Sequence, residues 1–196
     1  MNYPIAFRFK LAALASQLSA KDSAGGELFY VKQKMFKLKE KIEIYRDSSK
    51  SVLIGTLQAD RVIDFSPLLV LRDAQGAEIG TIKRQGRVSI WKATYDISLA
   101  GQPFAQVKEL NPWAKLFDAL MSEIPILGLF TGYVFHPRYG ITAPNGTLLG
   151  ELEKLAGFFE SNYQLSGTEL STLDEVKQSN FQLLMMAAVL RERMRG

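Results

Sequence analysis

Apolar and polar residues alternate along most of the chain, and this period of two predicts a protein built largely from β-strands. Near the start, Phe7, Phe9 and Leu11 alternate with Arg8 and Lys10. Apolar runs of this kind recur between turn-forming residues such as those of Asp22-Ser-Ala-Gly-Gly26. Strands are predicted at 7–20, 27–36, 42–44, 52–54, 68–71, 79–82, 88–91, 95–99, 104–107, from 139, at 147–154 and at 158–165.

The strand pattern is interrupted between residues 111 and 137. Asn111 and Pro112 suit the cap and the first position of a helix. The next apolar residues fall on one helical face, at Trp113, Leu116, Phe117, Leu120 and Met121. Pro125 ends this pattern, and residues 124–135 carry no charge. The segment 111–137 is therefore predicted as an insert with one amphipathic helix and an apolar loop.

The end of the chain predicts a buried helix. Thr172-Leu-Asp-Glu175 reads as a capping box, and between Phe181 and Leu190 only Gln182 is polar. A helix that is apolar on all sides lies in a protein core or in a membrane, and ten residues are too few to cross a bilayer. Many strands followed by such a helix predict a barrel or wrapped sheet with the helix as its core.

A short pattern recurs around three glycines in predicted strands. Gly55, Gly80 and Gly150 each stand between Ile or Leu and a polar residue that precedes Leu or Ile. Glycine inside a strand marks a bulge or a close approach of backbone, so these positions are candidates for bending the sheet around the helix. Chance recurrence of a short β pattern is the alternative.

The bulk composition narrows the class of protein. A chain of 196 residues, 47% hydrophobic and 22% charged, fits a single globular domain spanning 1–196. The absence of cysteine excludes disulfides and thiol catalysis and suits a reducing compartment. The apolar run at 11–15 is shorter than a signal-peptide core, and no stretch is long enough for a membrane span. We expect a cytoplasmic protein, peripheral to the membrane if it binds lipid.

Several runs of the sequence resemble the LURP-one-related family, relatives of the tubby C-terminal domain and the phospholipid scramblases. They are Phe29–Tyr45, Ile79–Arg84, Arg87–Tyr95, Gly157–Glu160 and Phe181–Arg193. The resemblance, to a bacterial-type member, implies an antiparallel barrel of about twelve strands around a buried C-terminal α-helix. The insert has no counterpart in that pattern, and the cysteine-rich and proline-rich segments of scramblases are absent, so scramblase activity is not carried over. The phosphoinositide-binding residues of tubby do not match positions in this chain.

Basic residues concentrate in two segments of the chain. Residues 32–46 contain six basic residues against two acidic ones, and residues 81–95 contain four basic residues. If the two segments are neighbours in space, they form a patch able to bind phosphate groups. The alternative is that lysines on strands are solvated and discourage edge pairing. The candidate phosphate- or lipid-binding residues are Lys32, Lys34, Lys83, Arg84, Arg87 and Lys92.

The insert supplies the candidate contact for a membrane or a protein partner. Its large apolar side chains would form such a surface if they were exposed. The alternative is that its helix plugs one end of the barrel. The candidate contact residues are Trp113, Phe117, Leu127 and Phe130.

Catalytic and metal-binding signals are weak. His136 is the only histidine, no nucleophile is spaced to it, and no glycine-rich phosphate loop occurs. We therefore expect a non-enzymatic binding module without cofactor or metal, associating with anionic phospholipid headgroups or a membrane surface. Docking of a protein partner through 113–130 is the alternative, and nucleic-acid binding is a third, weaker one. The oligomeric state is left open.

Overall fold

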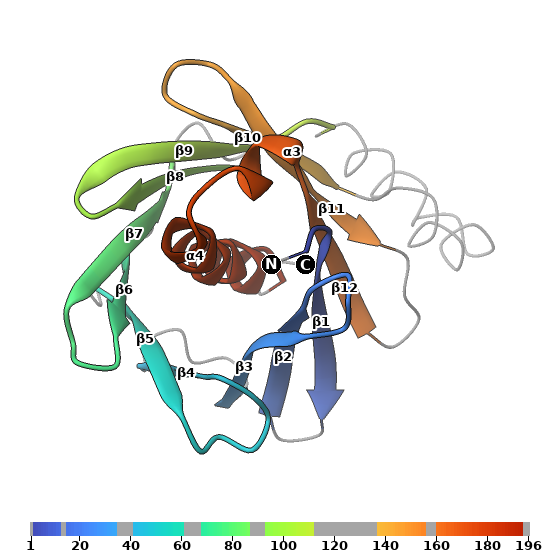
Figure 1. Ribbon diagram of the computed structural model, residues 1–196, viewed down its shortest axis with the longest axis vertical. Coiled ribbons are helices and arrows are strands. Elements are labelled where there is room, and N and C mark those ends of the chain that lie inside the picture. The colour runs from blue at the N-terminus through green and yellow to red at the C-terminus, as the bar shows by residue number, and fades with distance from the viewer. Residues whose placement is uncertain are drawn as a thin grey trace.

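Twelve antiparallel strands form a closed barrel around a central helix in the computed structural model (Figure 1). The structure describes residues 2–12, 15–34, 41–60, 68–86, 93–111, 137–155 and 160–193. Each strand pairs with the next in the chain, and β1 pairs with β12 to close the barrel. The strands are β1 (Ile5–Ala12), β2 (Ala15–Lys21), β3 (Glu27–Lys34), β4 (Ile42–Tyr45), β5 (Leu53–Ala59), β6 (Leu69–Asp73), β7 (Glu78–Arg84), β8 (Thr94–Leu99), β9 (Gln102–Glu109), β10 (Arg138–Thr142), β11 (Leu148–Leu155) and β12 (Glu160–Ser166).

This architecture confirms the predicted barrel around a buried helix, with one correction at its start. The segment predicted as one strand at 7–20 forms two, because β1 ends at Ala12 and β2 begins at Ala15, which pairs with it. A strand of that length would extend far beyond its neighbours, which have eight residues or fewer. The predicted strand at 88–91 and the predicted helix at 113–121 lie outside the described residues.

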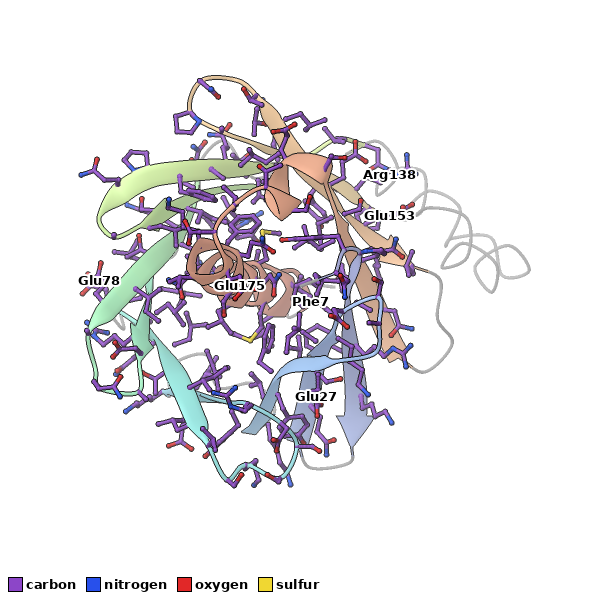
Figure 2. The ribbon with its side chains drawn as sticks, viewed as in Figure 1. Phe7, Glu27, Glu78, Arg138, Glu153 and Glu175 are labelled. Atoms are coloured by element: carbon purple, nitrogen blue, oxygen red, sulfur yellow. The ribbon has the colours of Figure 1, made fainter. Side chains whose placement is uncertain are left out.

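The helix α4 (Glu175–Arg193) fills the barrel, as Figure 1 shows. Residues 181–190 are all buried, and the helix packs closest against β6, β7 and β8. Phe7 points into the same interior (Figure 2) and is fully buried. At a bulge where Ile97 pairs with Ala105 and Ser98 with Pro103, the intervening Phe104 packs on Phe181, with ring centroids 5.4 Å apart. The strands supply alternate side chains to the core, so burial of the helix explains its apolar circumference.

The three recurring glycines lie at bulges and close approaches of backbone in the barrel wall, as expected for glycine inside a strand. Each one is buried and lies opposite a register shift in a neighbouring strand. A Cβ on Gly80 would collide with the carbonyl oxygen of Ser98 and meet Leu184 of α4. A Cβ on Gly150 would collide with Ser166 and meet Leu170 of the short helix α3 (Thr168–Ser171). Backbone and helices approach too closely at these positions for any side chain.

The start of α4 corrects the predicted capping box. The Oδ1 atom of Asp174 accepts a hydrogen bond from the backbone N–H of Lys177 at 2.9 Å, so Asp174 is the cap. Thr172 ends α3 instead, and its hydroxyl donates to the carbonyl oxygen of Glu169 at 2.8 Å. The cap signals at Thr172 and Asp174 overlap in sequence. Because Thr172 ends the short helix α3, Asp174 caps α4.

The two ends of the barrel differ in how the strands are joined. At one end, here the hairpin rim, short turns join the strands, at 22–26, 46–52, 74–77, 100–101 and 143–147. The first residue of β1 and the start of α4 lie at this rim. At the other end, the loop rim, the connections are 13–14, 35–41, 60–68, 85–93, 110–137 and 156–159. Because strands alternate in direction, every connection after an odd-numbered strand leaves from the loop rim.

Candidate functional site

Five exposed lysines surround the barrel near the loop rim, and we call them the lysine belt. Each lies on the outer face of its strand, or directly before it, within two residues of the end of that strand. They come from segments far apart in the sequence, which the closed barrel brings to one level. The belt consists of Lys10 of β1, Lys32 of β3, Lys41 before β4, Lys83 of β7 and Lys108 of β9. Lys32 and Lys83 were predicted site residues, whereas the other three were not.

The hairpin rim carries the opposite charge. Acidic residues outnumber basic ones among the described residues at this end, and several of them have a structural role in the turns. Asp22 accepts backbone hydrogen bonds from Ala24 and Gly26, and Asp47 accepts one from Ser49. Hydrogen bonds from the hydroxyl and then the backbone N–H of Ser49 lower the pKa of Asp47. The acidic residues at this rim are Asp22, Glu27, Asp47, Asp73, Glu78, Glu169, Asp174 and Glu175, against Lys21, Arg46, Lys50 and Lys177.

The two basic segments of the sequence reach the same rim on different parts of the wall. Strands β4, β5 and β6 separate β3 from β7, so Lys32 and Lys83 do not form one continuous patch on the outer face. Lys34 is the last residue of β3, at the loop rim. Lys83 pairs in register with Asp96, whose carboxylate accepts hydrogen bonds from the amides of Gln85 and Gln106.

Arg84 does not belong to the surface patch in which it was predicted. Its side chain is only 7% exposed and lies on the inner face of β7, with Ile82. Neighbouring residues of a strand point to opposite faces, so Lys83 and Arg84 cannot share one surface. On the same side of the wall, Glu109 is fully buried and accepts a hydrogen bond from the backbone N–H of Ala93 at 3.2 Å.

The remaining predicted contacts lie outside the described residues. They are Arg87, Lys92, Trp113, Phe117, Leu127 and Phe130, and their roles stay predictions. The chain on either side of the insert is well defined: the N–H of Leu110 donates to the carbonyl oxygen of Arg138 at 2.7 Å, and Asn111 accepts from the N–H of Arg138 at 2.9 Å. The insert therefore leaves and rejoins the barrel at one point of the loop rim.

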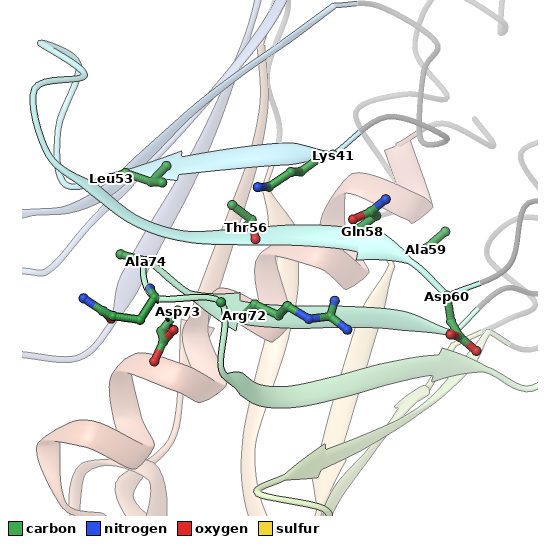
Figure 3. Close-up of a pocket in the computed structure, with 11 residues that line it drawn as sticks. Lys41, Leu53, Thr56, Gln58, Ala59, Asp60, Arg72, Asp73 and Ala74 are labelled. Carbon is green, nitrogen blue, oxygen red and sulfur yellow. Dashed lines mark hydrogen bonds between the residues drawn. The ribbon is translucent and has the colours of Figure 1, made fainter.

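A groove of about 460 Å³ crosses the outer wall at β4, β5 and β6 (Figure 3). Figure 3 shows Lys41, Thr56, Gln58 and Arg72 lying along it, with Asp60 at the end near the loop rim. Thr56 and Arg72 pair in register across β5 and β6. Thr56 is 7% exposed and Arg72 is partly buried, so both are recessed in the wall. The sequence did not predict this groove, because its residues come from three separate segments.

Acidic groups flank this groove, and contacts of their own already engage two of them. Asp73 accepts hydrogen bonds from the backbone N–H groups of Gln75 and Ala77, at 3.0 and 2.8 Å, both on Oδ1. On β4, the Tyr45 hydroxyl donates to Glu43 at 2.6 Å, and this bond raises the pKa of Tyr45. Neither carboxylate forms an ion pair with Arg72.

Within the described parts of the chain, no group of three or more His, Cys, Asp or Glu residues could hold a metal ion. The search of those same residues for a helix long and apolar enough to cross a membrane also found none. His136 lies outside them. The polar features that the described residues define include the lysine belt, the groove and two buried ionisable residues, Arg84 and Glu109.

The fold is thus a closed twelve-stranded antiparallel barrel with a helix through its centre. A model of the LURP-one-related family matches residues 27–121, from β3 through β9 and into the insert. This match confirms the resemblance to the LURP-one-related family seen in the sequence. No curated protein and no solved structure matches the chain.

Proposed function

We propose that the protein is a non-enzymatic binding module that associates with anionic phospholipid surfaces through its loop rim. The observation that carries this proposal is the lysine belt, which places five exposed lysines around one end of the barrel. Each lysine near an anionic membrane contributes about 1 kcal/mol to binding. Because the five lysines lie at one level, they can approach a flat anionic surface together. A location peripheral to the membrane in the cytoplasm follows from this proposal.

The composition of the connections also favours the loop rim as the membrane-binding end of the barrel. Each connection at the loop rim except 13–14 contains Phe or Trp, and both tryptophans of the chain are among them, at Trp91 and Trp113. The five turns of the hairpin rim contain no aromatic residue. Aromatic and aliphatic side chains combined with lysine are the composition of surfaces that bind at the headgroup boundary. Under this proposal Trp113, Phe117, Leu127 and Phe130 contact the membrane, and Lys34, Arg87 and Lys92 contact phosphates.

Co-sedimentation with vesicles tests the proposal. Neutral vesicles and vesicles with an anionic lipid are compared at low and moderate salt, using wild type and the double variant Lys83→Glu with Lys108→Glu. We expect salt-sensitive binding to the anionic vesicles alone, because salt screens these interactions, and a marked loss in the double variant. The matched control, Arg46→Glu with Lys21→Glu, makes the same charge change at the hairpin rim and should bind as wild type does.

Two results would contradict the lipid proposal. Wild type that fails to sediment with anionic vesicles at low salt removes it, and equal losses in both double variants would show that only net charge matters. In the first case the protein-docking alternative is tested by pull-down with Leu127→Asp and Phe130→Asp, which should abolish capture of a partner.

A further inference from the structure

The groove on the outer wall of β4, β5 and β6 offers several polar side chains that have no partner in the described parts of the protein. No hydrogen bond or ion pair engages the side chains of Lys41, Thr56, Gln58 or Arg72 there. All four line one space of about 460 Å³, which is within the usual range for small-molecule sites. A recessed arginine and a nearly buried threonine are held by the strands before any ligand arrives, so their side chains lose little freedom on binding.

Arg72 differs from Arg138, another arginine of the outer wall. Arg138, on β10, is exposed and forms an ion pair with Glu153 of β11, with Nε and Oε1 3.1 Å apart; Figure 2 labels both. That ion pair raises the pKa of Arg138. Arg72 precedes Asp73 in the chain and pairs in register with Glu78, but its side chain forms no ion pair with either carboxylate, and Asp73 accepts hydrogen bonds from its own turn. The guanidinium of Arg72 therefore faces the groove, as Figure 3 shows.

We propose that this groove binds a compound with a single phosphate group whose neighbouring groups are hydroxyls or an ammonium. Arg72 and Lys41 supply charge-assisted donors to the phosphate oxygens, and the Thr56 hydroxyl and the Gln58 amide add neutral donors. Asp60 at one end of the groove and Oδ2 of Asp73 at the other accept hydrogen bonds from the hydroxyls or the ammonium. The same two carboxylates repel a second phosphate, so singly phosphorylated compounds are preferred over doubly phosphorylated ones.

Calorimetric titration of the full-length protein tests this site. The probes are glycerophosphoethanolamine, which has one phosphate, hydroxyls and an ammonium, and fructose 1,6-bisphosphate, which has two phosphates. We expect the first probe to bind more tightly than the second. Arg72→Gln should weaken binding of the first probe by about tenfold or more, since a charge-assisted pair of hydrogen bonds is lost. Arg138→Gln removes an exposed arginine of the outer wall that does not line the groove, so it should leave the affinity unchanged.

A second variant tests the site through a gain of affinity, which a folding defect would not produce. Asp60→Asn removes one carboxylate without removing a donor from the phosphate, and it should raise the affinity for fructose 1,6-bisphosphate. Absence of binding by glycerophosphoethanolamine, an equal loss in Arg72→Gln and Arg138→Gln, or a preference for the bisphosphate in wild type would each overturn the proposal. Thermal unfolding of every variant establishes that the barrel is intact.

Vesicles distinguish the two sources of such a phosphate. Neutral vesicles that contain phosphatidylethanolamine present the group as a lipid headgroup, and the soluble probe presents it as a free compound. Binding of both that depends on Arg72 supports a headgroup site, and binding of the soluble probe alone supports a free ligand. This readout is separate from the lysine belt, since Lys83→Glu with Lys108→Glu should leave titration of the soluble probe unchanged.

Discussion

The two rims of the barrel are formed by the same strands, but they differ in charge and in the connections between the strands. The hairpin rim is closed by five short turns, is acidic and contains the start of α4. The loop rim is basic, with the lysine belt around it, and the long connections leave from it. Loops that vary in length on a rigid scaffold are where binding residues usually lie. The short, regular turns therefore lie at one end of the barrel, and the proposed binding surface lies at the other.

The acidity of the hairpin rim follows from turn chemistry. Asp22, Asp47 and Asp73 each stand at the start of a turn, where the side chain accepts backbone N–H groups two or four residues on. Gly25, Gly76, Gly101 and Gly146 take positive φ values in four of these turns. Aspartate is thus present here to form turns, and no such demand sets the charge of the loop rim. Lysine on its outer strands is consistent with selection for contact with an anionic surface.

The largest effect on stability is expected where α4 enters the barrel near the hairpin rim. Phe181→Ala removes the ring that packs on Phe104 and leaves a cavity in a fully buried position. We expect the free energy of unfolding to fall by about 3–5 kcal/mol, measured by urea denaturation. Val176→Ala, at an exposed position of the same helix, is the control and should change it by less than about 0.5 kcal/mol. Similar small losses in both variants would show that α4 does not form the core.

A medium effect is expected from the turns themselves. Gly76 has φ of 91°, and a Cβ there would meet no atom within 4 Å, so any loss comes from the backbone alone. Gly76→Ala should lower the free energy of unfolding by about 1–2 kcal/mol. Gly76→Asn should lower it less, because asparagine tolerates this conformation better. Equal stability of wild type and both Gly76 variants would contradict the explanation of the hairpin rim by turn chemistry.

A smaller, pH-dependent effect is expected at the start of α4. The hydrogen bond from the Lys177 backbone holds the pKa of Asp174 below its usual 3.8. A lowered folded-state pKa means that this contribution is present above the unfolded pKa and is lost as pH falls through the folded one. Asp174→Ala should lower Tm slightly at pH 7, and the difference from wild type should shrink on acidification below pH 3.8. A difference that grows in acid would contradict the cap.

The least effect on stability is expected at the loop rim. Since Leu110 and Arg138 are already hydrogen-bonded across β9 and β10, residues 112–136 can be replaced by a short glycine-rich turn. Loop length alters stability by only about 0.6 kcal/mol per doubling, so Tm should stay close to that of wild type. Sedimentation with anionic vesicles should weaken, because the apolar contacts are lost. A barrel that fails to fold would instead favour the plug interpretation of the insert.

Much of the fold was predictable because it rests on local patterns. Alternation placed Tyr95, Ile97 and Leu99 on one buried face, and the apolar circumference of residues 181–190 predicted the central helix. The same alternation also places Lys83 and Arg84 on opposite faces of β7, because Arg84 lies two residues after the buried Ile82. The prediction that the basic residues of 81–95 form one cluster did not take this alternation into account. Misplaced boundaries, at the 7–20 strand and at Thr172, occurred where two adjacent signals overlapped and contacts with other elements decided.

The candidate sites depended on closure of the barrel. By itself the sequence determined strands, turns, the buried helix and the resemblance to the LURP-one-related family, since these follow from neighbours along the chain. Only the tertiary structure decided that β3 and β7 lie apart, that Lys10, Lys41 and Lys108 join the same belt, and that Thr56 meets Arg72 in one groove. These contacts join residues from separate strands, and their geometry is set by strand pairing and register, which no single segment encodes.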